Sequence, residues 1–161
     1  MPSVVVNSTP IISLHHLGKL DLLEKMYHRV YIPYAVYEEV SVEGSYKTTR
    51  EILFSFSNFT VERVQNTEAK KYFKTALHEG EVEAMILTTE LDADLCVLDD
   101  QLARSYAKLL GLTITGTLGI LLKAKENKLL DKVMPLVDTL IEKEIYISTN
   151  LYQQIKVISG E

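Results

Sequence analysis

The chain has 161 residues, of which 47% are hydrophobic and 24% are charged, and it contains one cysteine. This size suits one domain over residues 1–161. Without a disulfide partner, a secretory signal or an apolar run of roughly 18–20 residues, it is expected to be cytoplasmic rather than secreted or membrane-bound. The formal net charge of −5 argues against a basic nucleic-acid coat, but not against an enzyme that gathers carboxylates around a metal ion.

Strand-like and helix-like patterns alternate along the chain. In chain order, they predict a strand at 3–6, two helices in 10–27 that break near Gly18, a strand at 29–33, a helix at 33–40, a loop at 42–50 and either an edge strand or a loop at 59–64. They then predict helices at 66–80 and 81–91, a strand at 94–98, a helix at 100–111, a strand at 112–115, helices at 117–129 and 131–143, a strand at 144–148 and a last helix at 149–158.

Such alternation is typical of βαβ units. We therefore expect an α/β fold, a three-layer α/β/α sandwich with a central, mainly parallel sheet. In sheets of this kind the ligand site lies beyond the carboxyl ends of the strands. That edge of the predicted sheet is where candidate functional residues should be found.

Small polar or acidic residues follow several predicted strands, and further acids lie on predicted helices. The candidates at the strand ends are Asn7, Ser8, Thr9, Asp99, Asp100 and Thr117, and those on helices are Glu38, Glu39 and Glu81. Carboxylates that converge on one edge repel one another, and a hard divalent cation relieves that repulsion. Oxygen ligands favour Mg²⁺ or Mn²⁺, which can bind a phosphodiester and activate water.

Each of these residues also has a purely structural interpretation. Asp99 or Asp100 could cap the following helix, Asn7 and Thr9 could shape a turn, and Glu81 could favour a helix N-terminus. Other chemistries have less support, because the sequence lacks the serine-hydrolase, zinc-protease, dinucleotide and P-loop motifs. Adjacent helical residues point about 100° apart, so His15 and His16 are expected to be ordinary histidines. Cys96 is expected to be a buried core thiol.

Five segments, in chain order, resemble the PIN-domain family and, within it, a prokaryotic PIN-like branch of predicted nucleic-acid-binding proteins. They are "VVVNSTPIISLHHLGKLDLL", "VYIPYAVYEEV", "HEGEVEAMIL", "LCVLDDQLAR" and "LTITGTLGILLKAK". The resemblance covers nearly the whole chain. It implies a helix-flanked parallel sheet and an acid cluster that binds Mg²⁺ or Mn²⁺ and cleaves single-stranded RNA with an activated water.

Carried over by position, the resemblance assigns roles to individual residues. It implies Glu39, Glu81 and Asp100 as catalytic acids. The implied metal ligands are Asn7, Glu39, Glu81, Asp99 and Asp100, and Thr117 is implied as a small polar group near the metal. Independently of the resemblance, Ser8 and Thr9 are expected to position phosphate, and Arg104, one turn after Asp100, to contact the RNA backbone or only to pair with a neighbouring acid. Asn7 departs from the family pattern, which places an aspartate there, so the site lacks one negative charge. The resemblance also implies a homodimer and a small antitoxin protein as partners, with no membrane.

These observations support a metal-dependent ribonuclease, with two alternatives. The uncharged Asn7 and the acidic composition also fit a PIN-fold module that binds RNA or protein with weakened catalysis. A metal-dependent phosphatase or other phosphoryl-transfer enzyme could use a similar acid cluster. The change Asn7→Asp distinguishes the first two, and hydrolysis of an aryl phosphate without action on RNA would favour the third.

Overall fold

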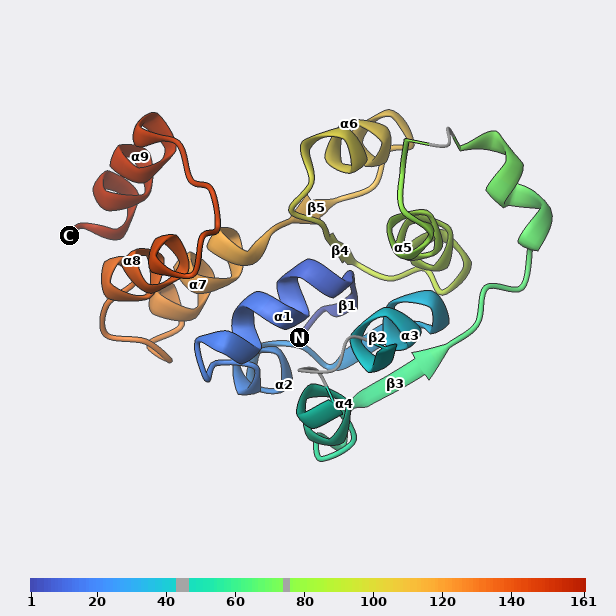
Figure 1. Ribbon diagram of the computed structural model, residues 1–161, viewed down its shortest axis with the longest axis horizontal. Helices are drawn as coiled ribbons and strands as arrows, with labels where there is room; N and C mark the ends of the chain where they lie inside the picture. The colour runs from blue at the N-terminus through green and yellow to red at the C-terminus, as the bar shows by residue number, and fades with distance from the viewer. Residues whose placement is uncertain (43–46, 74–75) are drawn as a thin grey trace.

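A central parallel sheet lies between two layers of helices in the computed structural model of the chain, which describes residues 1–42, 47–73 and 76–161 (Figure 1). The strands are β1 (Ser3–Val6), β2 (Arg29–Pro33), β3 (Phe59–Glu62), β4 (Leu95–Val97) and β5 (Ile114–Thr115). They are hydrogen-bonded in the order β3-β2-β1-β4-β5, and each neighbouring pair is parallel. The predicted three-layer α/β/α architecture is confirmed, and the segment 59–64, predicted as an edge strand or a loop, contains the edge strand β3.

Alternate residues of the strands face the two helical layers, because the side-chain period of a strand is two. Val4 and Val6 belong to the core cluster beneath α1, α2 and α7, whereas Val5 belongs to the second cluster with α5 and α6. All three valines are completely buried. Cys96 of β4 also faces the second cluster, and burial raises its pKa to about 11, as expected of a core thiol.

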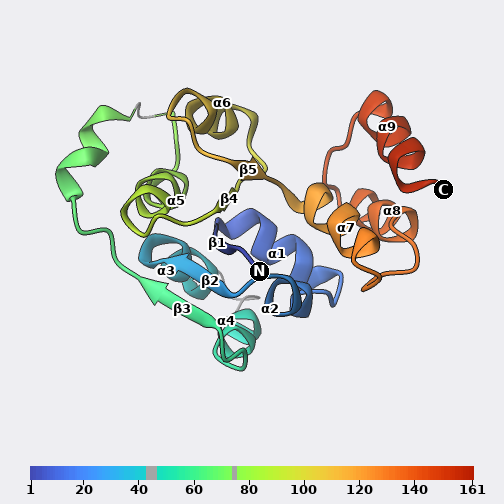
Figure 2. The same ribbon diagram turned by 180° about the vertical axis from the view of Figure 1, so that it is seen from behind.

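The helices fill the connections between these strands and the part of the chain after β5. They are α1 (Ser8–His16), α2 (Asp21–Met26), α3 (Tyr34–Val42), α4 (Lys47–Leu53), α5 (Glu79–Glu90), α6 (Gln101–Leu109), α7 (Thr117–Glu126), α8 (Met134–Glu142) and α9 (Thr149–Ser159), with a 3₁₀ helix, η2 (Thr67–Tyr72). The predicted break near Gly18 is confirmed: this glycine has φ +65°, a left-handed conformation that ends α1 before α2 begins. Seen from behind, α8 and α9 pack beside α7 beyond the end of the sheet (Figure 2).

Three sequence predictions were wrong in part. The helix predicted at 66–80 is only η2, which ends where Phe73 takes an extended conformation (φ −101°, ψ 145°), and α5 begins at Glu79. The predicted loop at 42–50 contains the end of α3 and, from Lys47, the start of α4, while residues 43–46 lie outside the described part.

The strand predicted at 144–148 is an irregular connection between α8 and α9. Its alternating pattern is real: Ile145 and Ile147 pack against the core, and Tyr146 between them is 90% exposed. However, the segment lies beside α8 and α9, away from the edge strand β5 (Figure 1). No strand is therefore available to pair with it.

Candidate functional site

The winding of the chain reverses between β1 and β4, which lie side by side at the centre of the sheet. The connections from β1 lead outward to β2 and β3, while those from β4 lead to β5 on the other side. A crevice opens at such a switch point beyond the carboxyl ends of the strands. Asn7 lies there: its backbone N–H donates to Val97 O of β4 at 3.2 Å. Asn7, the first of the candidate residues along the chain, therefore lies where a ligand site is expected in a sheet of this kind.

A cleft of about 910 Å³ extends along this edge, between α1, α3, η2 and the first turn of α5. Of the candidate residues, the following line it: Asn7, Ser8, Thr9, Glu38, Glu39 and Glu81. The structure therefore brings together candidates from the first strand end, from α3 and from α5.

The amide oxygen of Asn7 has no hydrogen-bond donor in the described part of the chain. Asn7 is only 3% exposed, and its Oδ1 atom is buried and unpaired. A buried acceptor without a partner costs about 1–3 kcal/mol, which a bound ligand would recover. The pattern of the sequence alone could not show this, because it depends on which donors reach the site.

Glu39 reaches the same place from α3. A β-carbon added to Gly80 would lie 2.5 Å from Glu39 Oε1 and 3.2 Å from Asn7 Oδ1, so both oxygens face the backbone of α5 at this glycine. A larger residue here would displace one of them. The other carboxylate oxygen, Glu39 Oε2, accepts a hydrogen bond from Ser8 Oγ at 2.6 Å, which fixes the direction of the Glu39 side chain.

Glu81 completes the group from the first turn of α5. It is 6% exposed, and burial raises its pKa, as do the nearby negative charges of Asp100 and Glu39. The charge and the backbone N–H of His78 act in the opposite direction. These electrostatic interactions show that Asp100 and Glu39 lie within reach of Glu81, so the predicted catalytic acids share one electrostatic site.

Asp100 has a structural function at the same time. Its Oδ2 atom accepts a hydrogen bond from Ala103 N at 2.9 Å and caps α6, which is the structural interpretation considered for this residue. Only one carboxylate oxygen is used in this cap. The prediction that Asp100 also takes part in metal binding remains a prediction.

Asp99 and Thr117 are hydrogen-bonded to each other, and neither lines the cleft. Asp99 Oδ1 accepts from Thr117 N at 2.8 Å, and Asp99 Oδ2 accepts from Thr117 Oγ1 at 2.6 Å, so this carboxylate ties β4 to the start of α7. Arg104 donates to Leu98 O at 2.8 Å and forms no ion pair with a described residue. These bonds give Asp99, Thr117 and Arg104 structural functions, and their predicted functions at the metal or substrate remain predictions.

The donor set can be compared with what a divalent ion requires. Among the described residues, no three His, Cys, Asp or Glu side chains lie close enough to form a metal site by themselves. Mg²⁺, however, is usually held by one or two carboxylates and keeps several waters. The unpaired amide oxygen of Asn7, beside the Glu39 and Glu81 carboxylates, is an all-oxygen set of this kind. The residues present therefore fit a hydrated Mg²⁺ or Mn²⁺ ion.

Glu83 is a buried acid of the cleft that the sequence reasoning missed. It is 6% exposed; its Oε1 atom accepts from Ala35 N at 3.0 Å, and its Oε2 atom accepts from Lys70 Nζ at 2.8 Å. Lys70 Nζ also lies 2.8 Å from Glu79 Oε1. Glu83, on α5, thus accepts a hydrogen bond from a backbone N–H group in the first turn of α3. This bond fixes the position of α3, the helix that carries Glu39. No local pattern could reveal a partner 48 residues away.

Fold and site together define a doubly wound α/β protein with an acidic, oxygen-rich site at its switch point. A family model described as a PIN domain matches residues 3–161, and the chain belongs to the PIN-domain family. The family resemblance predicted from the sequence is thereby confirmed. PIN domains are generally nuclease-like, and they typically use divalent metals.

The structure is also similar to a PilT N-terminus domain protein, SSO1118, from the hyperthermophilic archaeon Sulfolobus solfataricus P2. The two chains are 16% identical with a TM-score of 0.47, over 73% of this chain and 89% of that one. Comparison with curated proteins gave no match. In the described part of the chain, no helix has the length and apolar character needed to cross a membrane.

Proposed function

We propose that this protein is a ribonuclease that depends on Mg²⁺ or Mn²⁺ and cleaves single-stranded RNA. The observation that carries the proposal is the buried, unpaired Oδ1 atom of Asn7, which faces the same glycine as Glu39 Oε1. Glu81 lies beside them in the field of Asp100 and Glu39. Uncompensated buried oxygens of this kind are the arrangement that a divalent cation stabilises.

Asn7 and Glu39 would hold the ion, and Glu81 and Asp100 would complete its surroundings directly or through water. Once bound, a divalent ion supplies Lewis acidity toward a phosphodiester and lowers the pKa of water. Ser8 keeps Glu39 oriented through its hydrogen bond to Oε2. Glu81 is a buried carboxylate beside Glu39 in the cleft, so we assign to it the acceptance of the proton lost by the attacking water.

The test is cleavage of a labelled single-stranded RNA in Mn²⁺ by the wild type and by the Asp100→Asn variant. Asparagine caps a helix as well as aspartate does, so this change removes the charge but keeps the cap of α6. We expect a loss of about 100-fold or more, typical of removing a group from a metal site. The matched control is Glu68→Gln, an exposed acid of η2 outside the cleft. Unchanged cleavage in Asp100→Asn would overturn the assignment.

One observation favours a second candidate, a PIN-fold module with weakened catalysis. Asn7 supplies an amide oxygen but no charge, so the metal is held less tightly than an aspartate would hold it. The variant Asn7→Asp separates the two functions. If Asn7→Asp binds metal and cleaves RNA while the wild type does neither, then the wild type is a non-catalytic PIN-fold module.

The proposal extends to protein partners. We propose that the chain forms a homodimer and pairs with a small antitoxin protein. Two consecutive apolar side chains exposed on α9 support an interaction of this kind: Val157 is 79% exposed and Ile158 is 68% exposed. Light scattering of the purified chain tests the dimer, and a monomer at micromolar concentration would contradict it.

A further inference from the structure

The carboxyl edge of the sheet carries an arginine, Arg63, as well as its acidic residues. Arg63 directly follows β3, and Tyr34 directly follows β2. The two strands pair with Pro33 opposite Glu62, so the next residues of both strands are neighbours. The guanidinium carbon of Arg63 lies 3.6 Å from the centre of the Tyr34 ring. Both residues line the cleft that contains Asn7, Glu39 and Glu81.

Arg63 differs from Lys70, which also lines the cleft, in what it contacts. Lys70 Nζ lies 2.8 Å from Glu79 Oε1 and 2.8 Å from Glu83 Oε2, so its charge is already used by the protein. Arg63 is exposed, and within the part of the chain that the structure describes its guanidinium has no ion pair or hydrogen bond. Its N–H donors are therefore available to a ligand.

Stacking on a tyrosine suits a guanidinium to bind phosphate. The ring fixes the plane of the guanidinium, and the N–H groups at its edge remain free for two parallel hydrogen bonds. Such preorganisation reduces the side-chain entropy lost on binding. A phosphodiester is the ligand that this geometry and charge would recognise.

We propose that Arg63, held on Tyr34, binds a phosphate of the RNA strand next to the phosphate that is cleaved. This inference rests on the proposed function. β3 lies two strand spacings from β1, about 10 Å, so Arg63 is too far from Asn7 to contact the same phosphate. The strand runs along the carboxyl edge from β3 toward β1 and β4, and Arg63 offsets the repulsion between the RNA and the acids of the cleft.

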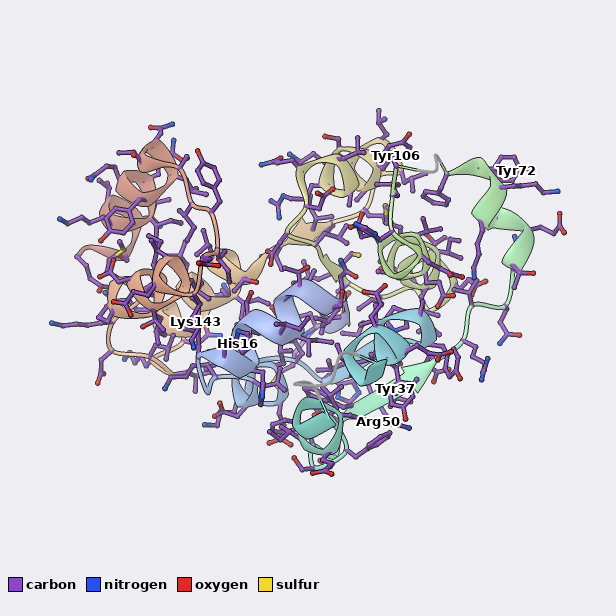
Figure 3. The ribbon with its side chains drawn as sticks, in the orientation of Figure 1. His16, Tyr37, Arg50, Tyr72, Tyr106 and Lys143 are labelled. Carbon is purple, nitrogen blue, oxygen red and sulfur yellow. The ribbon has the colours of Figure 1, made fainter. Side chains whose placement is uncertain are left out.

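The molecule contains a matched control for this pair. Arg50 of α4 lies over Tyr37 of α3, with 4.5 Å between the guanidinium carbon and the ring centre. Figure 3 shows both residues beside α4, and neither lines the cleft. Replacing Arg50 therefore removes the same charge and the same kind of stacking without removing a cation from the cleft.

The experiment measures RNA binding separately from cleavage. Fluorescence anisotropy of a labelled single-stranded RNA is recorded in Mn²⁺ at several salt concentrations, in a Glu81→Gln background that prevents turnover. Adding Arg63→Ala should weaken binding about tenfold, as for one charge-assisted contact. It should also reduce the slope of log K against log salt by about 0.7, because one phosphate contact is lost. Arg63→Lys should give an intermediate affinity, and Arg50→Ala should leave affinity and slope unchanged.

The salt slope distinguishes a phosphate contact from a structural function, because a partly unfolded sample loses binding amplitude without changing its slope. Equal slopes with and without Arg63→Ala, an equal loss in Arg50→Ala, or no RNA binding by the Glu81→Gln parent would overturn the inference. Cleavage by the wild type in Mn²⁺ is followed in parallel. If the wild type does not cleave RNA but Arg63→Ala shows the predicted binding defect, the proposed function fails and the phosphate site stands.

Discussion

Glu81, at the edge of the sheet, is surrounded by other acids, whereas Glu83 and Glu161, each between two helices, are surrounded by hydrogen-bond donors. Glu81 lies near other acids, and its pKa is raised by burial and by the charges of Asp100 and Glu39. Glu83, only two residues further along α5, accepts hydrogen bonds from Ala35 N and Lys70 Nζ. Residues two apart on a helix point about 200° apart, which explains how one helix presents both environments.

Glu161 is the clearest example of the donor-rich kind. Its carboxylate accepts hydrogen bonds from Lys125 Nζ and Val133 N at 2.8 Å and from Met134 N at 3.1 Å. Burial raises its pKa, but these donors outweigh burial and lower the pKa to about 2. It thus fastens the start of α8 to α7. A carboxylate surrounded by donors stabilises the fold, whereas one surrounded by acids needs a ligand.

The largest expected effect on stability is at Glu83. Glu83→Ala leaves the start of α3 and the charge of Lys70 without their buried partner, so we expect a loss of about 3 kcal/mol in the free energy of unfolding. Urea unfolding measures it. The control is Glu79→Ala, the other partner of Lys70, whose side chain is 67% exposed and whose loss should cost less than about 0.5 kcal/mol. Equal losses would contradict the assignment of Glu83.

Glu161→Gln should cost about 1–2 kcal/mol at neutral pH, because hydrogen bonds to a charged group are replaced by bonds to a neutral one. The folded pKa lies below the ordinary value of 4.5, so the stabilisation is present above pH 4.5 and is lost as the pH falls toward 2. Thermal unfolding of both proteins between pH 7 and pH 2 tests this. A difference that persists at the lowest pH would show that the charge of Glu161 is not its cause.

Glu81→Gln should have a smaller effect, in the opposite direction. A folded pKa that is raised means that the ionised group costs stability above that pKa, and this cost disappears as the pH falls through it. The neutral variant should therefore be more stable by about 1 kcal/mol at pH 7, a typical gain where function and stability conflict. At pH 4 the two proteins should unfold at nearly the same temperature. Destabilisation of Glu81→Gln at pH 7 would place Glu81 among the structural carboxylates.

Much of the fold was predictable because it depends on local patterns. The valine run of β1 and the break at Gly18 show, respectively, the apolar pattern of a buried strand and a turn residue, both of which are local features of the sequence. The helix predicted at 66–80 and the strand predicted at 144–148 were wrong because the local pattern did not decide the backbone: Phe73 is extended and ends η2, and no described strand lies beside 144–148.

The site divides in the same way. The positions of Asn7 and Glu81 followed from a strand end and a helix start, since parallel strands bring these to one edge, whereas Glu39 was placed by the family resemblance. The contacts of Arg63 with Tyr34 and of Glu83 with Ala35 depend on strand register and helix packing. Likewise, only the structure shows that Asp99 is bound to Thr117 and that Asn7 Oδ1 lacks a donor.

Mn²⁺ binding, measured by titration calorimetry, tests most directly whether Asn7, Glu39 and Glu81 form one cation site. The wild type should bind one ion, Asn7→Asp should bind it about tenfold or more tightly because it adds a charge, and Glu81→Gln should bind it about tenfold or more weakly. The exposed variant Glu68→Gln should bind like the wild type. Failure of both the wild type and Asn7→Asp to bind Mn²⁺, or equal affinity in the wild type and Glu81→Gln, would contradict the metal site.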